Sequence, residues 1–323
     1  MKPTLDTKLT AIRAGQYSPE HFIIADAKDG DMAFGTQCPG PDTQGSTKTK
    51  ADYLQAMEHM TASGLVDVML MSASSAETLH TRGIFNNSAV TPAVRMNDTT
   101  DIWMARHSRY RESSSQPFAT ADVDAVLPFC KLGLYSMTFS NDLDTDLRSL
   151  QAYRSFRLET RKKMSHFLEV FNPAFDIGIR HEEIGFYIND MIIKAVAGVT
   201  QVDAPQFLKI QFNGHRAMDE LCSYDPNNLI VGILGGAAGT TRDTFELIHQ
   251  AEQAGAKVAL FGRKINLSEA PLELVRLMRE TISGSLSPLD AVGQYHNYLA
   301  EHNITPQRSL SEDSRITETV LMA

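Results

Sequence analysis

The chain has 323 residues, of which 42% are hydrophobic and 21% charged, so it is long enough to bury a sizeable core as one large domain or two of ordinary size. Its formal net charge of -9 argues against nucleic acid as the main partner, because phosphate backbones are bound by Lys and Arg concentrated on one face. The three cysteines form no CxxC pair, so we expect no disulfides. The first residues form no apolar leader and no stretch approaches the length of a membrane span, so we expect a cytoplasmic protein without membrane contact.

Short apolar runs alternate along the chain with longer helical segments, which is the pattern of a parallel sheet. The apolar runs are Phe22 to Asp26, Val66 to Ser72, Val90 to Met96, Ala125 to Leu132, His166 to Phe171, Gln206 to Phe212, Leu229 to Leu234 and Lys257 to Phe261. Helices are predicted over Leu143 to Met164, Glu182 to Val199, Thr241 to Ala254 and Ala270 to Ile282. Eight such runs favour an α/β fold, and we predict a single (β/α)8 TIM barrel over residues 1–302. The alternative is an open doubly wound sheet with fewer strands.

Two segments depart from this regular alternation. Residues 97–122 follow the third strand and predict a long loop with a helical piece, on the side where barrels bind their substrates. This loop is either a lid over the site or a solvated insertion. Residues 303–323 are polar until the last few positions, and they predict a C-terminal tail that packs loosely or serves a subunit contact.

The most informative residue is Lys209, which lies inside the sixth apolar run. Because side chains alternate along a strand, Phe207, Lys209 and Gln211 share one face, and Leu208 and its neighbours on the other face suit a helix layer. Lys209 is therefore predicted to point into the barrel. A buried lysine is costly while it is charged, so it finds a partner or loses its proton, and the neutral amine is the form that attacks carbonyl carbons.

Three further ionisable residues are predicted at the ends of the inner strands. The same alternation places Glu169 inside the barrel on the fifth strand, while Lys131 ends the fourth and Asp26 ends the first. A second ammonium group near Lys209 would favour the neutral amine, and a carboxylate would oppose that effect but offer a proton shuttle. For any one of these residues alone, the alternative is a side chain at a strand end that reaches water.

Glycines follow the last two strands, where barrels often bind phosphate through backbone N–H groups and a helix N-terminus. Gly235 and Gly236 follow the seventh strand, and Gly262 and Arg263 follow the eighth. The turns alone are typical of any tight connection, and Arg263 has the alternatives of capping a helix or pairing with a surface acid.

Taken in order, these segments resemble the class I (Schiff-base) aldolase superfamily, and within it the tagatose-bisphosphate and sulfofructose-phosphate aldolases. The resemblance spans the barrel from its first strand to its last. It rests on Ile24-Ala25-Asp26, Cys130-Lys131-Leu132-Gly133-Leu134-Tyr135, Phe167-Leu168-Glu169-Val170, Phe207-Leu208-Lys209-Ile210, Leu234-Gly235-Gly236 and Ala254-Gly255-Ala256 with Phe261-Gly262-Arg263.

The resemblance implies a metal-independent lyase without a cofactor, which cleaves or forms a carbon-carbon bond in a phosphorylated ketose and assembles as a homo-oligomer. It also implies that Lys209 forms the imine, that Lys131 tunes it electrostatically and that Glu169 and Asp26 handle protons or substrate hydroxyls. The last two loops would hold a phosphate.

Three alternatives remain open from the sequence. The first is a catalytically silent barrel that senses a sugar phosphate, and the second is a transferase of the same superfamily. The third is a metal-dependent aldolase, although no two of the ten histidines form an HxxxH or HxH pair.

Overall fold

The computed structural model describes residues 3–42 and 45–322, and its centre is a closed barrel of eight parallel strands. The strands follow one another around the barrel in the order β1, β2, β3, β6, β7, β8, β9 and β10, and β10 closes the ring by pairing with β1. Their bounds are β1 Ile23–Lys28, β2 Val68–Met71, β3 Thr91–Arg95, β6 Leu132–Thr138, β7 Ser165–Phe171, β8 Leu208–Ile210, β9 Gly232–Leu234 and β10 Val258–Phe261. The predicted TIM barrel is confirmed, and the open sheet is excluded.

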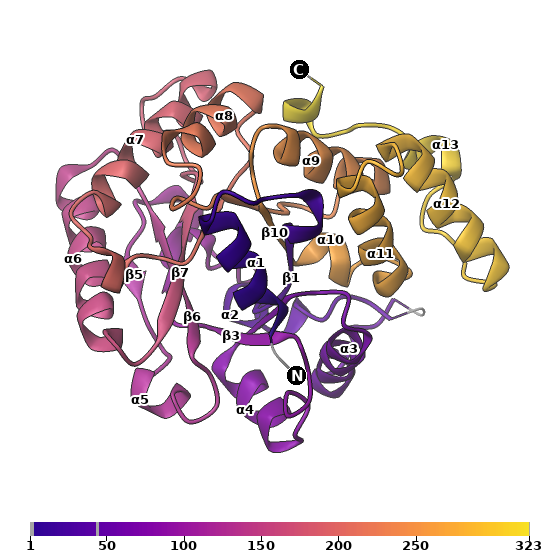
Figure 1. Cartoon of the computed structure of the whole chain (residues 1–323), viewed down its shortest axis with the longest axis horizontal. Helices are drawn as coiled ribbons and strands as arrows, with labels where there is room; N and C mark the ends of the chain where they lie inside the picture. The colour runs from indigo at the N-terminus through magenta and orange to yellow at the C-terminus, as the bar shows by residue number, and fades with distance from the viewer. Residues whose placement is uncertain (1–2, 43–44, 323) are drawn as a thin grey trace.

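Helices surround the strands on the outside (Figure 1). They are α1 Thr4–Arg13, α2 Asp31–Phe34, α3 Lys50–Ser63, α4 Ala73–Thr81, α5 Val123–Val126, α6 Leu143–Thr160, α7 Ile184–Val196, α8 His215–Tyr224, α9 Thr241–Gln253, α10 Arg263–Asn266, α11 Pro271–Ile282, α12 Pro288–Glu301 and α13 Leu310–Asp313. The four predicted helices correspond to α6, α7, α9 and α11, with ends that differ by a few residues.

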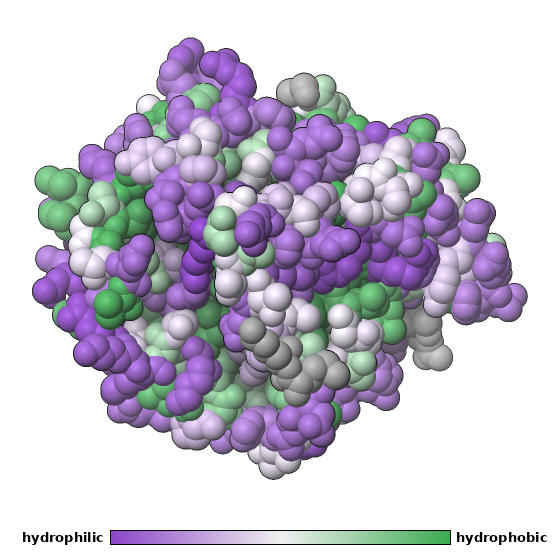
Figure 2. Space-filling view, viewed as in Figure 1, coloured by the Kyte–Doolittle hydropathy of each residue, from purple (hydrophilic) through white to green (hydrophobic). Residues whose placement is uncertain are grey.

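The apolar core has two parts, one inside the barrel and one between the strands and the helices. Helix α1 closes the amino-terminal end of the barrel, because Leu5, Leu9 and Ile12 pack against side chains that point inward from the first residues of the strands. This end lies toward the viewer in Figure 1, and the same face is mainly hydrophilic, with scattered hydrophobic residues, in Figure 2. The interior of the barrel is therefore closed at this end, and solutes reach it from the opposite, carboxyl-terminal end.

The fourth barrel strand lies later in the chain than predicted. The expected run from Ala125 to Leu132 begins within the short helix α5, which starts where the Asp122 carboxylate accepts the N–H of Ala125 at 2.7 Å. This cap commits the first apolar residues of the run to a helix, and β6 begins only at Leu132. The residues of this strand that point into the barrel therefore come from Leu132–Thr138, and not from the predicted run that ends at Leu132.

The two irregular segments are ordered parts of the structure. Residues 97–122 form a small antiparallel pair, β4 Asp98–Thr99 with β5 Pro117–Phe118, and two short 3-10 helices between them. Residues after α12 run back over the barrel to α9, where the Thr317 N–H and hydroxyl both donate to the carboxylate of Asp243. The tail is thus bonded to the barrel through Asp243, while most of its described residues are exposed. No helix in the described part of the chain is long and apolar enough to cross a membrane.

Candidate active site

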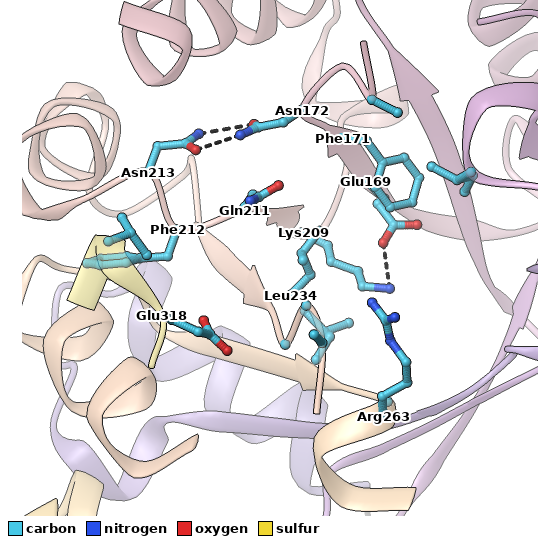
Figure 3. Close-up of a pocket in the computed structure, with 18 of the residues that line it drawn as sticks. Glu169, Phe171, Asn172, Lys209, Gln211, Phe212, Asn213, Leu234, Arg263 and Glu318 are labelled. Atoms are coloured by element: carbon cyan, nitrogen blue, oxygen red, sulfur yellow. Dashed lines mark hydrogen bonds and ion pairs between the residues drawn. The ribbon is translucent and has the colours of Figure 1, made fainter. Parts of the chain in front are cut away.

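A cavity of about 1330 Å³ opens at the carboxyl-terminal end of the barrel. Its walls come from the loops after β1, β7, β8, β9 and β10, from the 97–122 insertion and from the C-terminal tail. Lys209 and Glu169 reach it from the neighbouring strands β8 and β7, and Arg263 points into the same space from the end of β10 (Figure 3). This is the end where barrel enzymes carry their active sites.

Lys209 and Glu169 form a buried ion pair, with Nζ 2.6 Å from Oε1. Only 5% of Lys209 and 1% of Glu169 is exposed. Two residues earlier in the chain in each case, Phe167 of β7 and Phe207 just before β8 stack with their ring centres 4.6 Å apart and provide an apolar base beneath the pair. The inward orientation predicted for both charged residues is confirmed. The ion pair with Glu169 offsets the desolvation free energy of burying the Lys209 ammonium group.

Arg95 of β3 links this pair to a second carboxylate. Its Nη2 lies 2.8 Å from Oε2 of Glu169, and its Nε lies 2.5 Å from Oδ2 of Asp29. The Ser136 hydroxyl donates to the same Glu169 oxygen at 2.7 Å. Burial alone would raise the pKa of Asp29, but the positive charges of Arg95 and Lys209 outweigh it, and the pKa is lowered. Two cations and two carboxylates therefore balance one another inside the barrel.

Two buried carboxyl groups of the insertion lie beside this network. Burial raises the pKa of Asp98 to about 6 against the opposing charge of Arg95, whose Nη1 is 3.8 Å away. Asp101 is completely buried and lines the cavity. Burial also raises the pKa of Asp101, although the hydroxyls of Ser115 and Thr99 favour its ionised form. Both groups therefore hold a proton more readily than an exposed aspartate does.

Asp26 does not point into the cavity, and this prediction is wrong. Its register partners are Met69 and Phe261, which belong to the core between strands and helices, while Ala25 and Ala27 face the barrel interior. Its Oδ1 lies 3.3 Å from Nζ of Lys28, the next outward residue, and burial raises the pKa of Asp26 despite that ammonium group. The carboxylate that enters the site from this part of the chain is Asp29.

Lys131 also lies away from the cavity. It immediately precedes β6, is exposed and lines a small depression with residues of the loop before β7, at the amino-terminal end of the barrel. The prediction failed because the strand begins one residue after Lys131. The inward position of β6 that meets Glu169 belongs instead to Ser136, and the second cation of the site is Arg95 from β3.

The four residues predicted to bind phosphate all line the cavity. Gly236 has a φ of 66°, which favours glycine, and a Cβ on Gly262 would lie 2.8 Å from the carbonyl oxygen of Ala27. Among the described residues, no protein acceptor receives the N–H groups of Gly236 and Ala237. These groups can therefore bind an anion from solution.

The N-terminus of α9 is already occupied, contrary to expectation. The N–H of Thr241 donates to Asp313 of the tail at 2.8 Å, and the capping threonine Thr240 is bonded to Asp243. Glu318 of the tail lines the cavity and pairs with Nζ of the buried Lys264 at 2.7 Å. Backbone N–H groups of the turns, rather than this helix end, remain open to a ligand.

Sequence reasoning missed Asp29, Arg95 and Ser136. Arg95 carried the same signal as Lys209, a charged residue at the end of an apolar strand, and could have been found by the same argument. Asp29 lies past the predicted end of the first strand, and Ser136 past that of the fourth. In the described part of the chain, no three or more His, Cys, Asp and Glu side chains are arranged to hold a metal ion.

Comparison with solved structures finds TIM-barrel aldolases. A fructose-bisphosphate aldolase from Slackia heliotrinireducens superposes with a TM-score of 0.65 at 13% identity, covering 91% of this chain and 90% of that one. An archaeal fructose 1,6-bisphosphate aldolase gives a TM-score of 0.61 at 12% identity, covering 85% of this chain and 99% of the other. A Schiff base forming fructose-1,6-bisphosphate aldolase gives 0.60 at 14% identity with the same coverage.

At these identities the comparison establishes a shared fold. No protein-family model matches the sequence, and a search of curated proteins finds no relative. The chemistry of this chain is therefore indicated by the residues of its own cavity.

Proposed function

We propose that this protein is a class I aldolase, a lyase that cleaves or forms a carbon-carbon bond in a phosphorylated ketose through an imine on Lys209. The observation that carries the proposal is the buried amine at the base of a large cavity, 2.6 Å from the carboxylate of Glu169. An amine in such a place has both a proton acceptor and access to a carbonyl substrate.

The first step is a proton transfer from Lys209 to Glu169 across their short contact. The neutral Nζ attacks the ketone carbon, and the resulting carbinolamine loses water, with Glu169 returning its proton to the departing hydroxyl group. The iminium then accepts the electron pair of the breaking carbon-carbon bond, while a base takes the proton of the hydroxyl on the leaving fragment, which departs as an aldehyde. Protonation of the enamine and hydrolysis release the second product and regenerate the amine.

Glu169 is the best placed base for these transfers, and Asp29 replaces Asp26 as the second. Arg95 holds both carboxylates in position, with contacts of 2.8 Å and 2.5 Å. Its contact with Oε2 of Glu169 leaves Oε1 directed at Nζ of Lys209, which orients this carboxylate for the transfer. The open N–H groups of the turn at Gly236 are suited to the substrate phosphate.

Within this class, the sequence resemblance favours ketoses of the tagatose-bisphosphate or sulfofructose-phosphate type as substrates. We also propose that the reaction needs no metal ion and that the enzyme works in the cytoplasm as a homo-oligomer on a free sugar phosphate. Full activity after dialysis against EDTA would support metal independence, and a loss that Zn²⁺ restores would contradict it.

One observation favours a second candidate, a silent sensor of sugar phosphates. Lys209 is engaged in an ion pair, and an ammonium that stays charged binds anions and attacks no carbonyl. Such a protein would bind a sugar phosphate without turnover. A transferase of the same superfamily would instead form the imine and pass the enamine fragment to a second aldehyde.

The deciding experiment is borohydride reduction of the protein in the presence of phosphorylated ketoses, followed by peptide mass spectrometry. The proposal expects an adduct on Lys209, and none in Lys209→Met. Lys131→Met serves as the matched control, because it removes a lysine from the opposite end of the barrel. Absence of an adduct with every ketose that binds would establish the sensor, and product analysis with added aldehydes separates cleavage from transfer.

A further inference from the structure

The insertion over residues 97–122 holds a buried polar cluster on the side that faces the barrel. The short strand β4 of the insertion lies beside β6. The four residues of the cluster are at most 1% exposed, and they are Thr99, Asp101 and Ser115 from the insertion and Thr138 from the end of β6. The cluster therefore lies where the insertion meets the barrel.

The carboxyl group of Asp101 carries the charge of this cluster, and it has no cationic partner. Among the described residues, no Lys, Arg or His forms an ion pair with Asp101, and the groups that favour its ionised form are hydroxyls, led by that of Ser115. The nearby carboxylate of Asp98 differs, because Nη1 of Arg95 lies 3.8 Å from its Oδ1. A buried carboxylate without a compensating charge is costly, so it takes up a proton or binds a cation.

Three hydroxyl groups lie near the Asp101 carboxylate but are poorly bonded to it. Thr138 donates to Oδ1 at 3.4 Å, which is long for a hydrogen bond between two oxygens. The second carboxylate oxygen, Oδ2, and the hydroxyls of Thr99 and Ser115 are buried and have no hydrogen-bond partner in the part of the chain that the structure describes. Buried polar atoms in native proteins are normally satisfied by protein, water or an ion. Oxygens that share one cation lie in this way, close together but farther apart than hydrogen-bonded oxygens.

The chemistry of these ligand atoms indicates the kind of ion. All of them are oxygens, which suit a hard cation. One carboxylate with neutral hydroxyls balances a monovalent ion, whereas a divalent ion would leave a net positive charge buried. The cluster also has an entry path, because Asp101 lines the cavity.

We propose that the carboxylate of Asp101 and the hydroxyls of Thr99, Ser115 and Thr138 bind a monovalent metal ion, Na⁺ or K⁺, which fastens the insertion to the barrel. The ion offsets the buried negative charge and gives the unpartnered oxygens a ligand. Because three ligand residues belong to the insertion and the fourth to β6, the bound ion holds this wall of the cavity in place. It takes no part in the imine chemistry, and EDTA does not remove it.

The test compares the melting temperature of the full chain in NaCl, KCl and tetramethylammonium chloride at equal concentrations. The tetramethylammonium ion keeps the ionic strength but is too large for a buried site. At a salt concentration of about ten times the Kd, binding raises the melting temperature of a chain of this size by roughly 2–5 °C. We expect this rise in NaCl or KCl for the wild type and none for Asp101→Asn. Ser115→Ala should need about threefold to tenfold more salt for half of the rise, because it lacks one ligand.

The matched control is Glu112→Gln, which changes an exposed carboxylate of the same insertion to its amide. It should keep the full rise. A second readout is tryptic cleavage after the exposed Arg106 and Arg109 of the insertion. NaCl or KCl should slow this cleavage in the wild type and in Glu112→Gln, and leave its rate unchanged in Asp101→Asn.

Two results would overturn the inference. The first is an equal melting temperature of the wild type in all three salts, since the Asp101 carboxyl would then be neutralised by a proton. The second is a full rise that persists in Asp101→Asn. If that variant fails to fold, Ser115→Ala decides, because an unchanged salt midpoint would exclude its hydroxyl as a ligand. None of these measurements uses a substrate, so their outcome is independent of borohydride trapping on Lys209.

Discussion

The ion pair between Lys209 and Glu169 can be tested without any substrate, by a double-mutant cycle on stability. Glu169→Gln leaves two buried cations, Lys209 and Arg95, with one carboxylate fewer between them. Removing one partner of a buried pair typically costs about 3–5 kcal/mol, and we expect about 4 kcal/mol here. Lys209→Met keeps Glu169 bonded to Arg95 and Ser136, so its cost should be smaller, about 2 kcal/mol.

The double variant separates the pair from its surroundings. With both charges removed, Met and Gln occupy a site that is again neutral, so the loss should be about 3–4 kcal/mol instead of the additive 6 kcal/mol or so, a coupling of about 2–3 kcal/mol. Urea denaturation followed by far-ultraviolet circular dichroism measures the four free energies of unfolding. Additivity within about 0.5 kcal/mol would refute the reasoning, because it would mean that the two side chains do not sense each other.

Three further outcomes follow from the same structure. Lys131→Ala should change kcat/KM by less than about twofold, since the side chain is exposed at the far end of the barrel, and a tenfold loss in a steady-state assay would contradict its position. Between about pH 4 and pH 6, native Asp98, with its pKa of about 6, holds a proton that the unfolded chain has released, so the free energy of unfolding of the wild type falls as the pH rises. Asp98→Asn lacks this carboxyl group and does not lose that stability. The free energy of unfolding of the variant should therefore rise relative to the wild type by roughly 3 kcal/mol over this range. Parallel curves for the two proteins between these pH values would argue against this. Gly232→Ala should lower the free energy of unfolding by about 1–3 kcal/mol, because the new Cβ would lie 2.6 Å from the carbonyl oxygen of Leu208. An unchanged melting temperature would show that β8 and β9 separate easily enough to admit the methyl group.

The sequence was sufficient to predict the barrel and the orientation of its fifth and sixth strands. In both, a single charged residue lies at an alternate position among apolar ones, so the face that holds Lys209 or Glu169 is determined by the pattern. These predictions needed only the period of a strand and the requirement that the outer face pack against helices.

The first and fourth strands show where that method fails. All six residues of β1 are buried, on both faces, so nothing in the run distinguishes the side of Asp26 from that of Ala27. In the fourth strand, a helix cap at Asp122 divides an apolar run that looks continuous in the sequence. The strand therefore begins later than predicted, and Lys131 lies at its amino-terminal end instead of its carboxyl-terminal end.

Closure of the barrel through β1 and β10 places the earliest and latest segments of the chain beside each other. Asp29 follows the first strand and Glu318 belongs to the tail, yet both border the space that holds the reactive amine. The cavity around the amine is therefore complete only when both β10 and the C-terminal tail have been made and have joined the first strand.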